Sequence, residues 1–272
     1  MGISDKVILV ADTADFDEKI ELQSSHLEMT DKEQLERIML SIREMGKEVI
    51  LYHNPSDFSK NVTQHTNDFV VTLWSGKSSR NRRAIVPAIC EGNNIKYMGG
   101  DPYSALICQD KSLSKCLINR FDLDAPQHVI YDKHFSPSNL NRITFPVVVK
   151  PSLEGGSIGI SSSNLIHNSD EAVLFAEKLF EMFEQPILLE EFVHGAEVSI
   201  CIAGNSKSII LIEAIEVAYS DKPDYLFDKL YSYEEKRHKD MTKFREHRNV
   251  TNRIPKEILE NAKDLFLSLA GC

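Results

Sequence analysis

A glycine-containing loop that follows an apolar run is the segment best suited to bind a phosphate. In Phe145–Ile160 (FPVVVKPSLEGGSIGI), the apolar run ends at Lys150 and leads into a loop with two adjacent glycines and a serine. Glycine lets backbone N–H groups approach an anion closely, Ser157 adds a hydroxyl donor, and Lys150 supplies a positive charge from the end of a strand. The pattern is neither a Walker loop nor GxGxxG. It predicts a phosphate site, and an ordinary hairpin with one exposed lysine is the alternative.

Two further lysines lie upstream, in the segment Tyr97–Lys115 (YMGGDPYSALICQDKSLSK). Lys111 and Lys115 are four residues apart and therefore share one face of the helix expected there. Lysines on such a face are usually solvated. Lys111 becomes a candidate because Lys150 follows downstream on the glycine-loop strand, and we expect the ammonium groups of Lys111 and Lys150 to point at a common site.

Paired acids end the apolar run in Pro186–Ile200 (PILLEEFVHGAEVSI). Backbone groups at the end of such a strand can bind the edge of a purine, and a nearby carboxylate such as Glu197 can accept from ribose hydroxyls. The alternative for Glu190 and Glu191, each taken alone, is a strand edge that faces water. A fourth segment, Tyr231–His238 (YSYEEKRH), taken by itself indicates only a polar loop or surface helix.

Short apolar runs alternate with helical patterns in the first third of the chain. This alternation is typical of a parallel sheet with helices on its faces. The expected strands are Lys6–Asp12, Glu48–Tyr52, Asp68–Trp74 and Ile95–Met98, and the expected helices are Thr30–Met45 and Ala84–Glu91.

The rest of the chain has the pattern of an α+β structure. A helix is expected from Asp101-Pro102, an N-cap acid followed by proline, to about Phe121. Around Gly195 and Gly204-Asn205 the pattern indicates antiparallel reversals. The other expected helices are Asp170–Phe183 and Pro255–Leu269, and the expected strands are Gln127–Tyr131, Pro146–Lys150, Ile158–Ser162, Ile187–Val193, Glu197–Ala203 and Ser208–Val217.

Composition narrows the classes of function. The 272 residues carry a net charge of −10, which opposes non-specific binding to nucleic acid or to anionic lipid. The chain contains neither an apolar run of about 18 residues nor a signal-peptide pattern. The cysteines are widely spaced, which favours reduced thiols and a cytoplasmic protein over a nucleophile or zinc ligands; they are Cys90, Cys108, Cys116, Cys201 and Cys272.

Taken together and in this order, the four segments resemble the ATP-grasp fold, and specifically the D-alanine–D-alanine ligase family. That family reads roughly YxGSxxxxSALxxDKxxxK, then FPxIVKPxxEGSSxG, a strand ending in glutamate, GxEFTV and YDYEAKY. The resemblance covers about residues 95–272 and is most specific at the glycine loop and weakest at YSYEEK. It implies an α/β N-terminal domain with a parallel sheet (residues 1–100), followed by α+β ATP-grasp subdomains, a small lid (101–188) and an incomplete C-terminal part (189–272).

The resemblance also implies roles for single residues. Lys111 and Lys150 would hold the α- and β-phosphates of ATP, and Glu197 would accept from the ribose hydroxyls. Lys236 would lie near the γ-phosphate and the reacting carboxylate; with Ser157 it is the expected catalytic group. The loop that would close over the β- and γ-phosphates is Glu154, Gly155, Gly156 and Ser157, and the stretch that would present backbone groups to adenine is Glu190, Glu191, Phe192 and Val193.

The implied activity is an ATP-dependent carboxylate–amine ligase that forms a peptide or amide bond through an acyl phosphate, with Mg²⁺ beside ATP. The alternative is an ATP-binding fragment or pseudoenzyme that is inactive alone. The implied partners are ATP and small amino-acid-like substrates, without nucleic acid or membrane, and a homodimer is left open. A Rossmann oxidoreductase is disfavoured because no glycine follows the first strand.

Three departures from the family pattern bear on substrate and metal. The chain ends at Gly271-Cys272, so the metal-binding Asp and the ExNxxPG turn of the family are expected to be lacking, and no metal ligand is assigned. The glycine-rich turn with a substrate glutamate is absent after the first strand. The histidine-glycine loop is replaced by Leu73–Arg83 (LWSGKSSRNRR), so the substrate is expected to differ from D-alanine. The three arginines of this loop would bind a carboxylate or be solvated; they are Arg80, Arg82 and Arg83.

Overall fold

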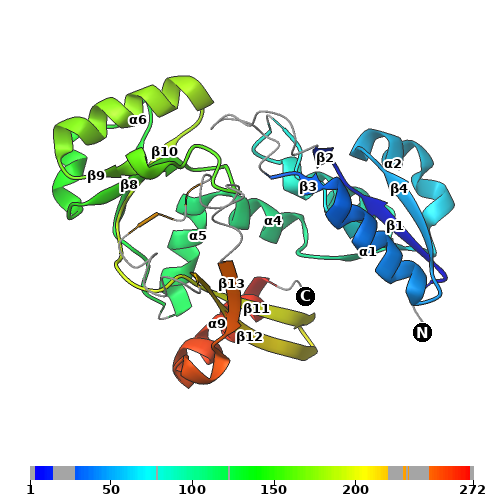
Figure 1. The fold of residues 1–272 in the computed structure, drawn as a ribbon. Coiled ribbons are helices and arrows are strands. Elements are labelled where there is room, and N and C mark those ends of the chain that lie inside the picture. The colour runs from blue at the N-terminus through cyan, green and yellow to red at the C-terminus, as the bar shows by residue number, and fades with distance from the viewer. Residues whose placement is uncertain are drawn as a thin grey trace. The chain divides into compact units, whose positions relative to one another are not determined.

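A computed structural model of the chain describes residues 4–14, 28–77, 79–121, 123–219, 229–230, 232 and 245–269 (Figure 1). The chain divides into two compact units, Met1–Gln109 and Asp110–Cys272, here called the N-terminal and C-terminal units. The expected division into three parts stays a prediction. The fold class is confirmed, because a parallel α/β sheet comes first and antiparallel sheets with helices follow. Among the described residues, no helix is long and apolar enough to span a membrane.

The N-terminal unit is built on a parallel sheet with the strand order β4-β1-β5-β6. The strands are β1 (Lys6–Val10), β4 (Glu48–Tyr52), β5 (Phe69–Thr72) and β6 (Lys96–Met98), and a short parallel pair joins β2 (Thr13–Ala14) to β3 (Thr30–Asp31). The helices are α1 (Lys32–Glu44), α2 (Pro55–Asn61), α3 (Ile85–Gly92) and α4 (Pro102–Gln109), with 3-10 turns at Val62–His65 and Arg82–Ala84. The strands confirm the alternation expected from the sequence.

Alternate residues of β1 fill two separate cores. Ile8 and Val10 pack with Phe58 of α2 and with residues of α3 on one face, whereas Val7 and Leu9 pack with α1 on the other. Successive side chains of a strand point to opposite faces, so one apolar strand can be buried on both sides. This arrangement fixes the carboxyl ends of the parallel strands at one edge, where the loops after β1 and β5 emerge.

The helix expected between Asp101 and Phe121 is interrupted, so that expectation is wrong. It ends at Gln109, and α5 (Lys111–Ile118) starts after Asp110, with a 3-10 turn at Asn119–Phe121. Asp110 has extended backbone angles, and its carboxylate accepts from the N–H groups of Ser112 and Leu113. These N–H groups lie in the first turn of a helix and have no partner within it. An aspartate that accepts from them therefore favours the start of a new helix over continuation of the previous one. Lys111 therefore becomes the first residue of a helix.

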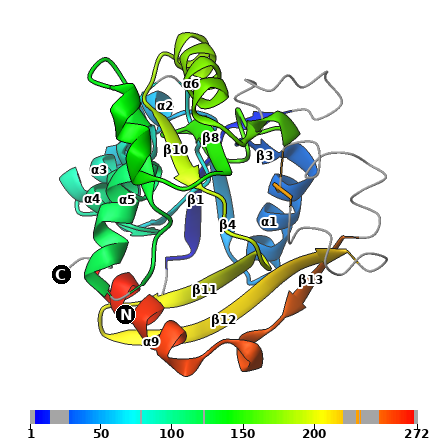
Figure 2. The ribbon, with the colours of Figure 1, turned by 90° about the vertical axis from the view of Figure 1, so that its left-hand side faces the viewer.

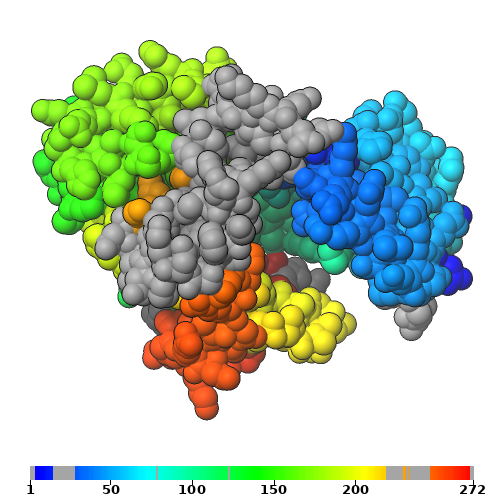
Figure 3. Space-filling view, in the orientation of Figure 1, coloured from blue at the N-terminus to red at the C-terminus, as the bar shows by residue number. Residues whose placement is uncertain are grey.

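The first sheet of the C-terminal unit is antiparallel, with the order β7-β10-β8-β9. Its strands are β7 (His128–Tyr131), β8 (Val147–Pro151), β9 (Leu165–Ile166) and β10 (Ile187–Glu191). Helix α6 (Ser169–Phe183) covers one face, and its outer side lies on the molecular surface (Figure 3). Between them lies the main core of this unit, and completely burying one such Leu, Ile or Val side chain contributes about 1.5–3 kcal/mol.

The strand expected at Ile158–Ser162 is absent, so this expectation is wrong. Gly159 within this segment has a φ of 75°, and Gly156 and Ser157 directly before it have φ values of 59° and 64°. Left-handed backbone angles are incompatible with an extended strand. The partner strand of β8 begins only at Leu165.

A second antiparallel sheet has the order β11-β12-β13, with α9 (Lys256–Leu269) packed against β11 (Figure 2). The strands are β11 (Val198–Asn205), β12 (Ser208–Tyr219) and β13 (Arg245–Asn249). The reversal expected at Gly204-Asn205 is confirmed by the β11–β12 hairpin. The one expected around Gly195 is wrong, because β10 and β11 belong to different sheets.

Candidate functional site

The face of the first C-terminal sheet opposite α6 carries the predicted site lysine and glutamate. Val147 and Val149 point into the core beneath α6, so Lys150 points to the other face. Lys150 is paired with Leu188 and Val148 with Glu190, which makes Lys150 and Glu190 diagonal neighbours on adjacent strands. Long side chains at such positions can touch. The antiparallel register therefore brings a cation of β8 to an anion of β10.

Glu190 binds two lysines in a buried cluster. Its Oε1 contacts Nζ of Lys150, and its Oε2 lies 2.6 Å from Nζ of Lys115 on α5. Glu190 is only 8% exposed. Burial alone would raise the pKa of Glu190, but the charges of Lys150 and Lys115 outweigh it and hold that pKa below its ordinary value. Glu190 is thus an ionised internal counter-ion, and the alternative of a water-facing strand edge is wrong for this residue.

Lys111 covers the start of the glycine loop with its ammonium group. Its Nζ donates to the carbonyls of Pro151 (3.2 Å) and Ser152 (3.4 Å), and also to that of Glu154. Its backbone N–H donates to Ser152 O at 3.1 Å. This position follows from the break at Asp110, whose carboxylate also accepts from the Ser152 hydroxyl at 3.3 Å. Lys111 and Lys150 thus have different partners, and a common site for their ammonium groups stays a prediction.

The glycine loop is a tight turn. Gly155 O accepts from Ile158 N at 2.9 Å, and both central residues, Gly156 and Ser157, have positive φ, as in a type I′ turn. A Cβ on Gly159 would lie 2.6 Å from Pro151 Cγ, so only glycine fits there. Such a turn directs successive N–H groups outward, which suits it to an anion.

Asn164, which was not predicted from the sequence, fixes the far end of this loop. Its side chain is completely buried, and its Nδ2 donates to Val149 O and Gly159 O, both at 2.6 Å. Its Oδ1 accepts from Ser161 N at 2.7 Å. A buried amide with its polar atoms satisfied rigidifies its surroundings. No short-range sequence pattern predicts the role of Asn164, because its partners lie up to fifteen positions away in sequence.

The stretch predicted to face adenine has part of its backbone already engaged. Glu191 N–H donates to Gln127 O and Phe192 N–H to Pro146 O, both at 3.0 Å. The Glu191 carboxylate accepts from Thr144 N at 2.6 Å. Val193 is 67% exposed. The N–H groups of Glu191 and Phe192 are therefore already engaged. Adenine binding by this stretch would instead use Val193 and the backbone carbonyl groups.

The remaining predicted residues have separate outcomes. Glu197 is exposed just before β11, and its carbonyl accepts from Val217 N at 3.3 Å. Ser157 is buried within the turn. Lys236 lies outside the described residues, as does most of YSYEEKRH. In the part of the chain that the structure describes, no group of three or more His, Cys, Asp or Glu side chains is arranged to hold a metal ion.

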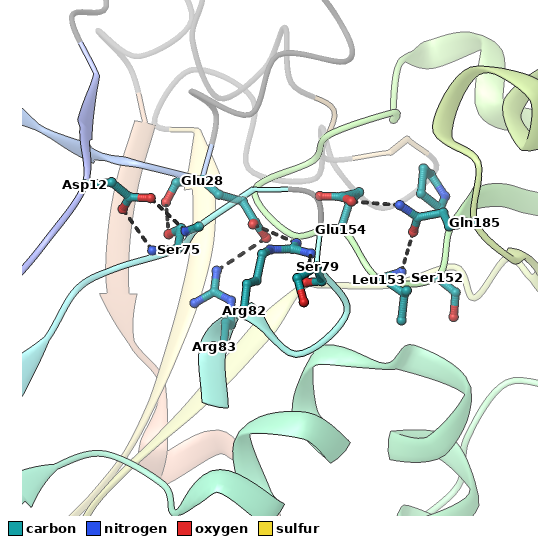
Figure 4. Close-up of polar contacts among 12 residues, drawn as sticks. Asp12, Glu28, Ser75, Ser79, Arg82, Arg83, Ser152, Leu153, Glu154 and Gln185 are labelled. Atoms are coloured by element: carbon teal, nitrogen blue, oxygen red, sulfur yellow. Dashed lines mark hydrogen bonds and ion pairs between the residues drawn. The ribbon is translucent and has the colours of Figure 1, made fainter. Parts of the chain in front are cut away.

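Two arginines of the loop Leu73–Arg83 bind a carboxylate of the chain itself (Figure 4). Glu28 Oε2 lies 3.1 Å from Arg82, and Glu28 Oε1 lies 3.3 Å from Arg83. The side chains of Glu28 and Arg82 are each 4% exposed, so Arg82 is not a solvated charge. In the same loop, the Asp12 carboxylate accepts from the N–H groups of Ser75 and Gly76. Glu28 was not predicted, because a single acid in a polar stretch carries no signal.

The antiparallel sheet covered by one helix, the two lysines bound to Glu190 and the glycine turn after β8 are together typical of the ATP-grasp class of proteins. A family model described as "D-ala D-ala ligase C-terminus" matches residues 121–272, more than half of the chain. The chain therefore belongs to the D-alanine–D-alanine ligase family, and the resemblance expected from the sequence is confirmed.

Individual relatives are distant and longer. The chain is 29% identical over 181 residues to a D-alanine–D-alanine ligase of Wigglesworthia glossinidia brevipalpis, covering 64% of this chain and 47% of the relative. It is 28% identical over 150 residues to the vancomycin/teicoplanin A-type resistance protein VanA of Enterococcus faecium, covering 55% of this chain and 42% of the relative. The chain thus spans about half the length of these relatives.

Solved structures share the fold. A D-alanine–D-alanine ligase from Bacillus anthracis complexed with ATP matches with a TM-score of 0.62 and 17% identity, over 97% of this chain and 78% of that one. The VanG D-Ala:D-Ser ligase from Enterococcus faecalis gives a TM-score of 0.65 and 17% identity, over 97% and 82%. At this identity the likeness establishes the fold alone.

Proposed function

We propose that this chain binds ATP on the face of β8 and β10 opposite α6 and acts as an ATP-dependent carboxylate–amine ligase. The observation that carries the proposal is the buried cluster Lys115–Glu190–Lys150 beside a glycine turn. Two ammonium groups and one carboxylate leave a net positive charge in a poorly hydrated place. A polyphosphate would complete this charge balance through charge-assisted hydrogen bonds.

The proposed contacts follow the family resemblance. Lys111 and Lys150 would bind the α- and β-phosphates, the turn 154–157 would cover the β- and γ-phosphates, and the stretch 190–193 would hold adenine. Glu197 would accept from the ribose, and Lys236 would approach the γ-phosphate. Lys111 supports this arrangement because it already lies against the start of the turn.

The proposed reaction has two steps. A carboxylate oxygen of the first substrate bonds to the γ-phosphorus of ATP, and the bond from this phosphorus to the β-γ bridging oxygen breaks, which releases ADP. The amine nitrogen of the second substrate then bonds to the acyl carbon and loses a proton, and phosphate leaves with the electrons of its C–O bond.

Within this reaction the lysines would offset the charge of the transferring phosphoryl group. The glycine turn, once closed, would exclude water from the acyl phosphate. Mg²⁺ accompanies ATP throughout this family. The described residues offer no carboxylate group arranged to hold it, and no step is assigned to the ion.

Nucleotide binding is tested first with Lys150→Ala. The variant removes one phosphate partner while Glu190 keeps its contact with Lys115, so the fold should be retained. We expect ATP binding to weaken by about 1.5–3 kcal/mol, roughly 10- to 150-fold in the dissociation constant measured by calorimetry. Lys178→Ala, on the exposed side of α6, is the matched control. Equal affinity of the two variants would contradict the role of Lys150.

Catalysis is tested by following ADP release from the chain with ATP, Mg²⁺ and mixtures of amino acids. Release that requires both a carboxylate and an amine substrate supports the ligase. Bound nucleotide without release in any mixture would identify an ATP-binding module instead, and no binding at all would refute the proposed function.

A further inference from the structure

The side chain of Gln185 continues the β8–β10 hydrogen-bond ladder after the backbone pairing ends. Ser152 N–H donates to Pro186 O at 3.0 Å, next to the last strand pair. The next donor along the chain, Leu153 N–H, bonds to Oε1 of Gln185 at 2.8 Å. The side-chain carbonyl therefore takes the place of a strand carbonyl, at the point where the chain leaves β8 for the glycine loop.

The same amide also holds the first residue of the loop (Figure 4). Its Nε2 donates to Oε1 of Glu154 at 2.7 Å. A carboxylate only accepts and a backbone N–H only donates, so a single orientation of the amide satisfies both neighbours. An acidic side chain at position 185 would face the Glu154 carboxylate with like charge, and an apolar one would leave both contacts unmade.

Local structure places Gln185 at this position. Helix α6 ends at Phe183, and its C-cap residue Glu184 adopts left-handed backbone angles while its N–H donates to Phe180 O at 2.9 Å. Pro186 directly follows Gln185 and disfavours helical backbone angles at Gln185. Gln185 therefore does not continue the helix. It lies between the C-cap of α6 and the start of β10, beside the end of β8.

Glu154 is thus held from two elements. Gln185 binds its carboxylate from the α6–β10 turn, and Lys111 binds its carbonyl from the start of α5. The next residues, Gly155 and Gly156, are the most permissive of the loop, and Gly156 is exposed. Backbone rotation is therefore least hindered at these two glycines.

We propose that Gln185 is a positioning residue that fixes Leu153 and Glu154 as the root of the glycine loop, so that the loop closes over its ligand by rotation at Gly155-Gly156. This inference rests on the proposed function, because the ligand is taken to be ATP. Gln185 touches no reacting atom and acts through Glu154.

The test combines amide hydrogen exchange with ATP binding in the full chain. Gln185→Leu removes both bonds at similar volume, and we expect the exchange rate of Leu153 N–H to rise roughly tenfold, with a similar rise in the dissociation constant of ATP. Gln64→Leu, an exposed glutamine of the N-terminal unit, is the control and should leave both unchanged.

A reciprocal exchange separates positioning from general loss of structure. Gln185→Glu places two carboxylates together, so ATP affinity should fall at pH 7 and recover partly as acid protonates one of them. Gln185→Glu combined with Glu154→Gln restores one donor and one acceptor, and should recover part of the ATP affinity that Gln185→Glu alone loses.

Three results would overturn the inference. An unchanged exchange rate of Leu153 N–H in Gln185→Leu would show that Gln185 does not fix Leu153 and Glu154. Faster exchange with unchanged ATP affinity, or no rescue in the double variant, would reduce Gln185 to a structural contact. If the original chain binds no ATP, the proposed function fails, and the exchange measurement alone then decides whether Gln185 fixes the root.

Discussion

The Glu190 carboxylate shows how one side chain can control the lysines around it. A buried carboxylate needs a counter-charge, and Glu190 has two. If Lys150 binds a phosphate as proposed, Lys115 would still neutralise Glu190, so no unpaired buried charge would be created. Removing one partner of a buried pair is usually costly for this reason. Lys115 would thus leave Lys150 available to bind a phosphate.

Replacing Lys115 with Met tests this dependence. With only Lys150 left to neutralise Glu190, we expect ATP to bind about tenfold more weakly, because phosphate and carboxylate compete for one ammonium group. Adding Glu190→Gln removes the competitor and should recover part of that loss in the same calorimetric titration. A Lys115→Met chain that binds ATP normally would exclude the coupling.

The lowered pKa of Glu190 has a consequence for stability against pH. A group whose pKa is lower in the folded chain contributes stability above its unfolded value, here 4.5, and loses it as pH falls through the folded value. The difference in unfolding free energy between the original chain and Glu190→Gln should therefore be constant near neutrality and shrink below pH 4.5. Urea titrations of both chains at several pH values would measure it, and a constant difference down to acid pH would contradict the assignment.

At the scale of elements, the glycine loop depends on close packing as well as on backbone angles. Gly159 and Gly46 have nearly the same φ, 75° and 74°, but a Cβ meets Pro151 and Phe183 at Gly159 and nothing within 4 Å at Gly46. Gly46→Ala should cost about 1–2 kcal/mol of unfolding free energy from backbone strain alone. Gly159→Ala should cost about 1–3 kcal/mol more through overlap. Chemical denaturation would compare them, and equal losses would refute the packing argument.

Elements were predictable from sequence where local chemistry dominates. Apolar runs such as Lys6–Val10 and Glu48–Tyr52 predict strands, and Gly204-Asn205 predicts a hairpin. The polar strand β13 (REHRN) carries no alternating pattern and was missed. Its pairing with β12 is a long-range property, and strand propensity depends on such context.

The candidate site was predictable in part for the same reason. The glycine loop and Lys111 are recognisable as local motifs, whereas the partners of Glu190 depend on strand register and on helix α5, which begins far earlier in the sequence, at Lys111. An aspartate directly before Lys111 was itself a cap signal that the helical pattern around it obscured. Gln185 and Asn164 are long-range contacts without any local pattern.

For the whole molecule, the proposed nucleotide contacts all belong to the C-terminal unit, from Lys111 to Lys236. ATP at 100 times its dissociation constant should stabilise that unit by about 2.7 kcal/mol. Hydrogen exchange should accordingly slow in β8 and β10 and stay unchanged in β1 and β5 of the N-terminal unit. Equal protection of both sheets would show that nucleotide contacts are not confined as proposed.

The helix break at Asp110 has a practical consequence for making shorter versions of this protein. One family motif, Tyr97–Lys115, is shared between two compact units, with its tyrosine and glycines in one and its lysines in the other. A recombinant fragment that begins at Asp110 keeps the cap of α5 and the lysines, whereas one that begins at Lys111 starts with uncapped N–H groups. Cloning boundaries drawn by motif alone would miss this one-residue difference.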